Sequence, residues 1–391
     1  MKVSILTPDF SSNALGRAYL LAQLISKFCE VEIVGPVMDN YIWNPLLDQT
    51  TIPFKVIKWN SLFSIKEIFS AIDGDIIYVS KPLITSFGVG LLYQKKYKIP
   101  LILDIDDWEL GFALDNFKSI KGLFYLVPHK FNRYHSLISC FILEKVTEAI
   151  KDEIQITVSN SFLQKKFGGT IIWHTRDEDI FDPKKYNSSD IRRELKIQED
   201  KIVVMFIGTP RPYKGVIELI LSIYNSKDLR NDPRIVIVIG GIGDDHYSKQ
   251  VVQLGKKLLG DKVLFIKNIP FKELPKVLSI CDIYVIPQKR TYSTFGQMPA
   301  KLFDAMAMGK AIISTDVSDI PRILDKVGII VSSYETLLKR ELSNAILYLI
   351  DNSNEIKKLG KKARTKFIKQ YGFKAMRRRL KIILQKAYKR Q

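Results

Sequence analysis

Two loops in the second half of the chain carry basic residues where a buried strand gives way to a helix. The first is GTPRPYKG, residues 208–215, in which Arg211 and Lys214 stand between two glycines. Arginine can bind a phosphate through two parallel hydrogen bonds, lysine supplies a point charge, and a helix N-terminus adds backbone N–H groups. The loop is therefore either a diphosphate site or an ordinary solvated loop, and its residues alone do not decide between the two.

The second loop opens the stretch GQMPAKLFDAMAMGK, residues 296–310. Pro299 suits the first turn of a helix, and Lys301 and Asp304 are three residues apart, which places them on one helix face. The two charges could form a local ion pair. They could instead contact a nucleotide, with Lys301 on phosphate and Asp304 accepting hydrogen bonds from ribose hydroxyls, as acids do in dinucleotide sites.

Several acids end a strand in the first half of the chain, at LILDIDDWELGF, residues 101–112. Asp104, Asp106 and Asp107 are followed by Trp108. Clustered carboxylates suit Mg²⁺ or Mn²⁺, so a metal site is one interpretation. A structural network of acids capped by the tryptophan is the other.

The loop after the first expected strand, TPDFSSNALGRAY, could also contact a substrate. Gly16 would let a substrate approach the start of the following helix, and Arg17 could bind an acceptor phosphate. A plain turn with a helix cap from Ser12 or Asn13 is the alternative.

Short apolar runs alternate with helical patterns along the whole chain. Because these runs lack period-2 alternation, they favour parallel strands covered by helices on both faces. We therefore expect an α/β protein with two Rossmann-like, doubly wound domains, whose ligands bind beyond the carboxyl ends of the strands. The expected strands are residues 2–8, 31–36, 54–59, 75–80, 100–105, 156–160, 170–174, 202–208, 234–240, 262–267, 283–287, 311–315 and 328–332.

The two loops of the second half, GTPRPYKG and PAKLFDAMAMGKAII, resemble the donor half of GT-B glycosyltransferases, particularly family 4. Many members carry R-x-x-K-G and P-x-K-x-x-E-x-M-A-x-G stretches in these loops. Asp177, Phe181 and Pro183 also match D-x-x-x-F-x-P, which ends the family's crossing segment. The resemblance covers nearly the whole chain and implies a GT-B fold. The domains would be residues 1–185 for the acceptor, 186–372 for the donor, and a basic helix, 373–391, that packs toward the first domain.

The resemblance implies a retaining enzyme that moves a sugar from a nucleotide-diphosphate sugar to a lipid-linked or polysaccharide acceptor in cell-surface glycan synthesis. Side chains and helix dipoles neutralise the diphosphate in this fold, so no metal ion or other cofactor is expected. The catalytic residues would be Arg211, Lys214 and Asp106, and the acceptor-side residues Gly16, Arg17, Asp107 and Trp108. The donor-binding residues would be Gly208, Thr209, Arg211, Lys214, Gly296, Gln297, Met298, Pro299, Lys301 and Asp304.

Three positions depart from the family pattern. Gly296 stands where the family has the first acid of its pair, Asp304 is one methylene shorter than the second, and Asp106 replaces a histidine. The first acid helps to hold the donor sugar in the family. Its loss keeps open an alternative, a catalytically inactive GT-B subunit that binds a nucleotide sugar or a protein partner.

Charge and composition restrict the partners further. The net charge is +19, and residues 361–391 contain thirteen Lys or Arg and no acid. With the aromatic and basic segment 122–146, this tail predicts a cytoplasmic protein that attaches peripherally to the anionic inner face of the cell membrane. A solvated basic helix is the alternative. No uncharged apolar run approaches the length of a membrane span, and no nucleic-acid motif accompanies the charge.

Overall fold

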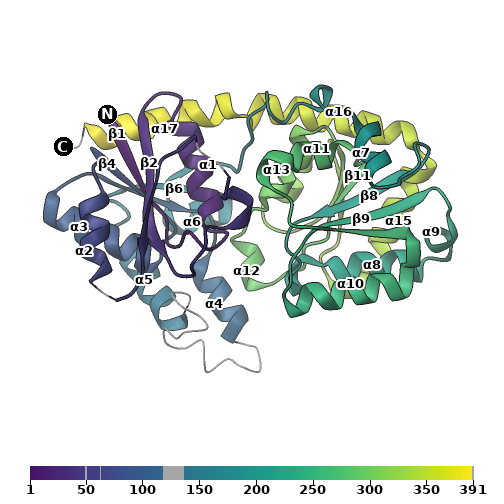
Figure 1. Ribbon diagram of the computed structural model, residues 1–391, viewed down its shortest axis with the longest axis horizontal. Helices are drawn as coiled ribbons and strands as arrows, with labels where there is room; N and C mark the ends of the chain where they lie inside the picture. Colours follow the sequence, from purple (N-terminus) through teal and green to yellow (C-terminus); the bar gives the residue numbers. More distant parts are fainter. Residues whose placement is uncertain (49–50, 62, 118–135, 390–391) are drawn as a thin grey trace. The chain divides into compact units, whose positions relative to one another are not determined.

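The chain forms two compact units in the computed structural model (Figure 1), which describes residues 1–48, 51–61, 63–117 and 136–389. Unit 1 comprises residues 1–174, 291–298 and 373–391, as far as they are described, and unit 2 comprises residues 175–290 and 299–372. Each unit is built around one parallel sheet. This confirms the predicted α/β fold with two Rossmann-like domains.

The sheet of unit 1 has seven strands in the order β3-β2-β1-β4-β5-β6-β7. The chain runs outward from β1 in one direction and then outward from β4 in the other, so the loops after β1 and β4 flank the point where strand order reverses. Ligands bind such sheets at this point. The strands are β1 (Lys2–Leu6), β2 (Glu30–Val37), β3 (Phe54–Lys58), β4 (Ile76–Ser80), β5 (Leu101–Ile105), β6 (Gln155–Val158) and β7 (Thr170–Ile171).

Helices cover both faces of the unit 1 sheet, which is why the central strands β1, β4 and β5 are mostly apolar. Helices α1 and α17 contact each other on one face, whereas buried residues of α2, α3 and α5 join the core cluster on the other. The helices are α1 (Leu15–Ile25), α2 (Ser64–Ala71), α3 (Val89–Tyr97), α4 (Glu109–Phe117), α5 (Leu137–Ile150), α6 (Ser161–Phe167), α12 (Tyr292–Phe295) and α17 (Phe373–Tyr388), with short turns of helix η1 (Asn44–Leu46) and η2 (Ile84–Gly88).

The sheet of unit 2 has six strands in the order β10-β9-β8-β11-β12-β13. They are β8 (Ile202–Ile207), β9 (Ile235–Ile242), β10 (Val263–Lys267), β11 (Ile283–Ile286), β12 (Ala311–Thr315) and β13 (Ile329–Val331). The helices are α7 (Ser188–Glu194), α8 (Val216–Asn225), α9 (Lys227–Asn231), α10 (His246–Leu259), α11 (Leu274–Ser279), α13 (Ala300–Ala307), α14 (Ile320–Leu324), α15 (Glu335–Asp351) and α16 (Ser353–Gln370), with short turns η4 (Pro183–Lys185), η5 (Pro212–Lys214), η6 (Gly260–Lys262) and η7 (Phe271–Glu273).

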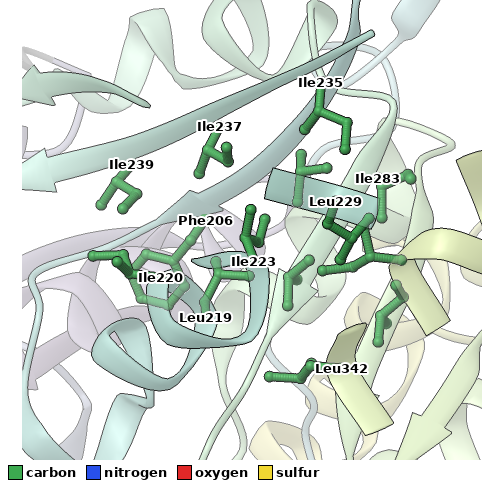
Figure 2. Packing of buried hydrophobic residues seen from close by; sticks show 14 of the residues in the cluster. Phe206, Leu219, Ile220, Ile223, Leu229, Ile235, Ile237, Ile239, Ile283 and Leu342 are labelled. Carbon is green, nitrogen blue, oxygen red and sulfur yellow. The ribbon is translucent and has the colours of Figure 1, made fainter. Parts of the chain in front are cut away.

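One apolar core joins the unit 2 sheet to helices α8, α10 and α15 (Figure 2). Ile235, Ile237 and Ile239 alternate along β9 and face α8, from which Leu219 and Ile220 pack back. These five side chains are almost or fully buried, and each such burial stabilises the fold by about 1.5–3 kcal/mol. The core therefore fixes the strands whose ends carry the loops of interest.

The compact units divide the chain at other points than the predicted domain boundaries. Unit 2 begins at Thr175 rather than after residue 185. The side chain of Phe181 is buried and its carbonyl oxygen accepts a hydrogen bond from Arg364 in α16, at 2.6 Å. Residues 291–298 belong to unit 1, although they follow a strand of unit 2 in the chain. The basic helix α17, predicted as a segment that packs toward the first domain, is part of unit 1 and contacts α1.

Candidate active site

The loop between β8 and α8 in unit 2 adopts a conformation that depends on its glycines. Gly208 has φ +131° and Gly215 has φ +69°, a region that side chains disfavour. A Cβ atom on Gly215 would lie 1.8 Å from the carbonyl oxygen of Pro287, so the loop can lie against the end of β11 only with glycine here. The Lys214 ammonium donates a hydrogen bond of 2.8 Å to the carbonyl oxygen of Thr209. The loop thus holds its lysine at the carboxyl end of the sheet.

Arg211 lies at the exposed rim of the same loop. Its Nη1 atom is 3.2 Å from Oδ2 of Asp245 and donates a hydrogen bond to the Pro210 carbonyl oxygen. The side chain remains 44% exposed. Asp245 also caps α10 by accepting a hydrogen bond from the Ser248 backbone N–H, at 3.1 Å. The guanidinium is therefore oriented by the protein and still accessible to a ligand.

Lys301, in the first turn of α13, extends back under the first loop. Its Nζ atom lies 3.9 Å from the ring centroid of Phe206, and it would be only 2.8 Å from a Cβ atom on Gly208. Burial lowers the pKa of Lys301 well below its usual value, the Lys214 ammonium lowers it further, and Asp304 acts in the opposite direction. A bound anion would oppose both effects that lower this pKa and would favour the charged form of Lys301.

Asp304 is buried and forms an ion pair with Arg176. The distance from Arg176 Nε to Asp304 Oδ1 is 2.5 Å. The Arg176 guanidinium lies 5.7 Å from the ring centroid of Phe181 and 5.1 Å from that of Phe271. Burial raises the pKa of Asp304, and Arg176 opposes this shift. Within unit 2, the acid that we expected to pair locally with Lys301 or to bind ribose is thus held by an arginine from a distant part of the chain.

The acids after β5 in unit 1 surround a lysine that the sequence analysis did not single out. Lys81 follows β4, and its Nζ atom lies 2.8 Å from Asp106, 2.6 Å from Asp107 and 3.0 Å from Glu109. Burial alone would lower the pKa of Lys81, but the three carboxylates outweigh it and raise this pKa well above the usual value. Burial raises the pKa of Asp106 to about 7. We call these four residues the Lys81 cluster.

Asp104, one of the predicted metal-binding candidates, is occupied by Arg17. The guanidinium binds the carboxylate through two hydrogen bonds of 2.8 and 2.9 Å, and both side chains are buried. Thr157 donates a third hydrogen bond to the same carboxylate, at 2.7 Å. Arg17 was predicted to bind an acceptor phosphate, but its guanidinium points into unit 1. Gly16, the other residue predicted in this loop, packs near the ring of Trp43.

Residues 291–298, including part of the predicted donor loop, are docked on unit 1. The Asp115 carboxylate accepts hydrogen bonds from the Ser293 backbone and hydroxyl, at 2.7 and 2.5 Å. A Cβ atom on Gly296 would lie 2.3 Å from Cβ of Trp108, so an acid at this position would displace the tryptophan. Gln297 donates a hydrogen bond of 3.3 Å to Oδ1 of Asp107.

The predicted site residues therefore fall into two groups. Unit 1 brings together the acids after β5, Trp108 and three residues predicted to bind the donor: Gly296, Gln297 and Met298. Unit 2 brings together Gly208, Thr209, Arg211, Lys214, Pro299, Lys301 and Asp304. Sequence reasoning missed Lys81 and Arg176. Arg176 stands next to Asp177 of the D-x-x-x-F-x-P segment, whereas no motif pointed to Lys81.

The surface of unit 1 carries the charge and apolar residues that predicted membrane contact. Helix α17 packs Met376, Leu380 and Leu384 inward and leaves most of its basic residues exposed. On α5, Phe141 and Ile142 are about half exposed. Part of the aromatic segment 122–146 lies outside the described residues. No helix within the described ranges is both long and apolar enough to cross a membrane.

Comparisons with known proteins agree with this architecture. Residues 187–366 match the family model of glycosyl transferases group 1. Over 375 residues, the chain is 23% identical to the uncharacterized glycosyltransferase MJ1069 of Methanocaldococcus jannaschii, a match that covers 90% of this chain and 85% of that protein.

Two solved structures show the same fold. Anabaena HepE, in complex with UDP and glucose, has a TM-score of 0.76 at 16% identity and is matched over 98% of this chain and 99% of its own. WaaG, a glycosyltransferase involved in lipopolysaccharide biosynthesis, has a TM-score of 0.67 at 12% identity, matched over 97% and 99%. The fold is thus that of GT-B glycosyltransferases, and residues 187–366, most of unit 2, are similar to group 1 of the glycosyl transferases.

Proposed function

We propose that the protein is a retaining glycosyltransferase that transfers a sugar from a nucleotide-diphosphate sugar to a lipid-linked or polysaccharide acceptor. The observation that carries the proposal is that two lysines meet the glycine-dependent loop of unit 2: Lys214 belongs to it, and Lys301 Nζ lies 2.8 Å from the position of a Cβ atom on Gly208. Like charges repel unless an anion lies between or beside them, and a diphosphate supplies that anion. HepE, which has a similar fold, forms complexes with UDP and glucose.

The proposed chemistry requires little acid–base catalysis from the protein. Arg211, Lys214 and Lys301 stabilise the charge that develops on the leaving phosphate, and the N-terminus of α8 adds backbone N–H groups. That phosphate takes the proton of the attacking acceptor hydroxyl on the same face of the sugar, which retains the anomeric configuration. Asp304, held by Arg176, accepts hydrogen bonds from the ribose. No metal ion or other cofactor takes part in this scheme.

Unit 1 would receive the acceptor. Asp107 is the acid of the Lys81 cluster with the most exposed side chain, at 19%, whereas the side chain of Asp106 is 6% exposed. We therefore assign contact with the acceptor to Asp107 and Trp108, and support of Asp107 from behind to Asp106. The exposed basic face of α17 fits an anionic membrane surface, where lipid-linked acceptors reside.

Packing at Gly296 favours a second candidate function, a GT-B subunit that binds a nucleotide sugar without turning it over. The family acid at this position is absent, and the contact with Trp108 leaves no room for one. Intact Arg211 and Lys214 argue for the enzyme, because a subunit that only binds the donor would not need them to stabilise the charge on a leaving phosphate.

A panel of nucleotide-diphosphate sugars tests both functions. A donor that binds only the folded state raises the melting temperature, by mass action. The enzyme is expected to bind at least one of them and to release the nucleoside diphosphate when a membrane extract supplies acceptor. Binding without any release of nucleoside diphosphate, either by transfer or by hydrolysis, would establish the non-catalytic function. A panel in which no nucleotide sugar or nucleoside diphosphate shifts the melting temperature contradicts both.

A further inference from the structure

We propose that Lys81 is the resident cation of the acidic cluster at the end of β5, where it takes the place of a divalent metal ion and positions Asp107. The inference deepens the proposed glycosyl transfer and rests on it for the assignment of Asp107 to the acceptor. It assigns a role to a residue that no motif identifies. It also gives a structural cause for the metal independence that the GT-B resemblance implies.

The Lys81 ammonium forms ion pairs with three carboxylates. Lysine has three N–H donors, and Nζ lies 2.6–3.0 Å from one oxygen each of Asp107, Asp106 and Glu109. The Lys81 side chain is only 9% exposed. Two donors make hydrogen bonds, to Asp107 and Glu109, and Asp106 completes the ion pairs, so with little surface left this ammonium does not bind substrate. Its effect is exerted through the acids around it.

The backbone around Lys81 is fixed in a conformation that lysine rarely adopts. Its φ is +70°, which costs about 1–2 kcal/mol for a residue with a side chain. The Lys81 N–H donates to the Asp104 carbonyl oxygen at 2.9 Å, and the Ser86 hydroxyl donates to the Lys81 carbonyl oxygen at 2.8 Å. Strain that the surroundings hold in place is typical of functional positions. The fold therefore maintains the ammonium at this point between β4 and β5.

The acids around Lys81 lie close enough together to share a divalent ion as ligands. One oxygen each of Asp106, Asp107 and Glu109 lies within 4.8 Å of the others. Hard oxygen ligands of this kind suit Mg²⁺ and Mn²⁺. Asp104, the remaining acid of the strand end, is held by Arg17 and is not available to a metal. A cation is thus needed among three carboxylates, and the side chain of Lys81 supplies it.

The consequence for catalysis is the position of Asp107. One of its oxygens accepts from Lys81, and the other accepts from Gln297 in the docked segment 291–298. Lys81 thereby fixes the carboxylate that we assign to the acceptor. It is a positioning residue, and the catalytic contacts belong to other groups.

Removal of the lysine tests the proposal, because it should convert the cluster into a metal site. Manganese binding is measured by electron paramagnetic resonance for the wild type, Lys81→Ala, Lys81→Ala/Asp107→Asn and Lys98→Ala. Lys98 is the matched control, since it is a second lysine with positive φ, +58°, but is exposed and lies outside the cluster. We expect Lys81→Ala to bind one Mn²⁺ at least tenfold more tightly than the wild type and Lys98→Ala, and the double variant to lose that gain.

Sugar transfer supplies a second readout that a purely structural lysine would not give. The wild type should be unaffected by EDTA, whereas Lys81→Ala should lose at least tenfold in kcat and regain part of it with Mn²⁺. Equal Mn²⁺ affinity in wild type and a folded Lys81→Ala overturns the proposal, as does EDTA-sensitive wild-type transfer restored by Mn²⁺. Lys81→Gln, which keeps two N–H donors without the charge, replaces Lys81→Ala if the latter does not fold. Binding of a nucleoside diphosphate, a test of unit 2, distinguishes failure of this proposal from failure of the proposed function.

Discussion

The carboxyl ends of the two sheets carry opposite balances of charge. Among the charged groups at the ends of β4 and β5 in unit 1, two cations face four carboxylates: Arg17 and Lys81 against Asp104, Asp106, Asp107 and Glu109. Among the candidate site residues of unit 2 and their direct partners, four cations face two carboxylates: Arg176, Arg211, Lys214 and Lys301 against Asp304 and Asp245. The same sheet architecture therefore supports an acidic network in one unit and a basic loop in the other.

The difference lies in which charges already have internal partners. Arg17 and Lys81 of unit 1 are both buried and paired with carboxylates, so they contribute to the structure of the site rather than to ligand binding. In unit 2, Arg176 is bonded in this way, but Arg211 remains 44% exposed and the Lys301 ammonium lies over an aromatic ring. A site that must bind an anion keeps cations that the fold has not fully neutralised, and unit 2 has this property.

The largest effect should come from breaking the internal neutralisation of unit 1. Arg17→Met leaves the buried Asp104 carboxylate without its bidentate partner, which should lower the free energy of unfolding by about 3–5 kcal/mol. Urea denaturation followed by circular dichroism measures this loss. Arg193→Met is the matched control, because Arg193 pairs with Asp190 at the surface, with side chains 81% and 53% exposed, and should change stability little. Equal stabilities of the two variants would mean that Arg17 has no structural role.

The second effect concerns binding in unit 2. Lys214→Ala and Lys301→Met should each weaken the binding of a nucleoside diphosphate by about 1–3 kcal/mol, because each loses a charge-assisted contact. Isothermal titration calorimetry gives the dissociation constants. Lys267→Ala removes a lysine that is 76% exposed at the end of β10 and should bind as the wild type does. Wild-type affinity in both loop variants would remove these lysines from the donor site.

A smaller but more specific effect is proton uptake on binding. Burial, and after it the Lys214 ammonium, lower the pKa of Lys301, so the unliganded protein loses this proton at a lower pH than an ordinary lysine does. A diphosphate raises that pKa, and the complex then holds more protons than its components. The affinity should therefore fall as the pH rises through the pKa of Lys301 in the unliganded protein.

Calorimetry in buffers of different ionisation enthalpy detects this uptake. At alkaline pH, the wild type should take up a fraction of a proton per bound nucleoside diphosphate. Lys301→Met should show less uptake, and the Lys267→Ala control should match the wild type. Identical uptake in wild type and Lys301→Met would assign the proton to another group.

Fold and site differ in how far the sequence predicted them. Thirteen apolar runs were expected to be strands, and each overlaps one of the thirteen strands found in the described residues, because a strand buried on both faces needs a continuous apolar run. The positions of Arg211, Lys214 and Lys301 at strand ends also followed from the order of strands, loops and helices. Local pattern was sufficient for these features.

The partners of the buried charges could not be predicted in this way. Arg17 and Asp104 are 87 residues apart in the sequence. Arg176 lies at the start of unit 2, whereas its partner Asp304 lies in the second segment of that unit. Lys81 directly follows β4, and no neighbouring glycine or acid distinguishes it as a candidate site residue. Such pairings depend on which strands become neighbours, and charge and spacing within one loop do not encode that. The sequence therefore identified charged groups at the strand ends but not which of them neutralise one another.

The last comparison concerns the outer surfaces of the two units. In unit 1, α17 buries an apolar stripe and exposes Arg378, Arg379 and Lys381, next to further basic residues of the acid-free tail. In unit 2, α10 exposes Lys256 and Lys257, which form an ordinary basic helix end. If α17 contacts the membrane, charge reversal there should release the protein from anionic vesicles, whereas reversal on α10 should not.

Each basic residue near an anionic surface contributes about 1 kcal/mol, and salt screens this attraction over about 10 Å at 0.1 M. Sedimentation with phosphatidylglycerol vesicles at low salt should therefore recover the wild type and Lys256→Glu/Lys257→Glu. It should leave Arg378→Glu/Arg379→Glu/Lys381→Glu largely in the supernatant. Binding that survives high salt would come from apolar contacts such as Phe141 and Ile142 of α5, and the double variant Phe141→Ser/Ile142→Ser should abolish it. If the wild type does not sediment even at low salt, the basic face of α17 serves solubility, and a soluble acceptor replaces the lipid-linked one.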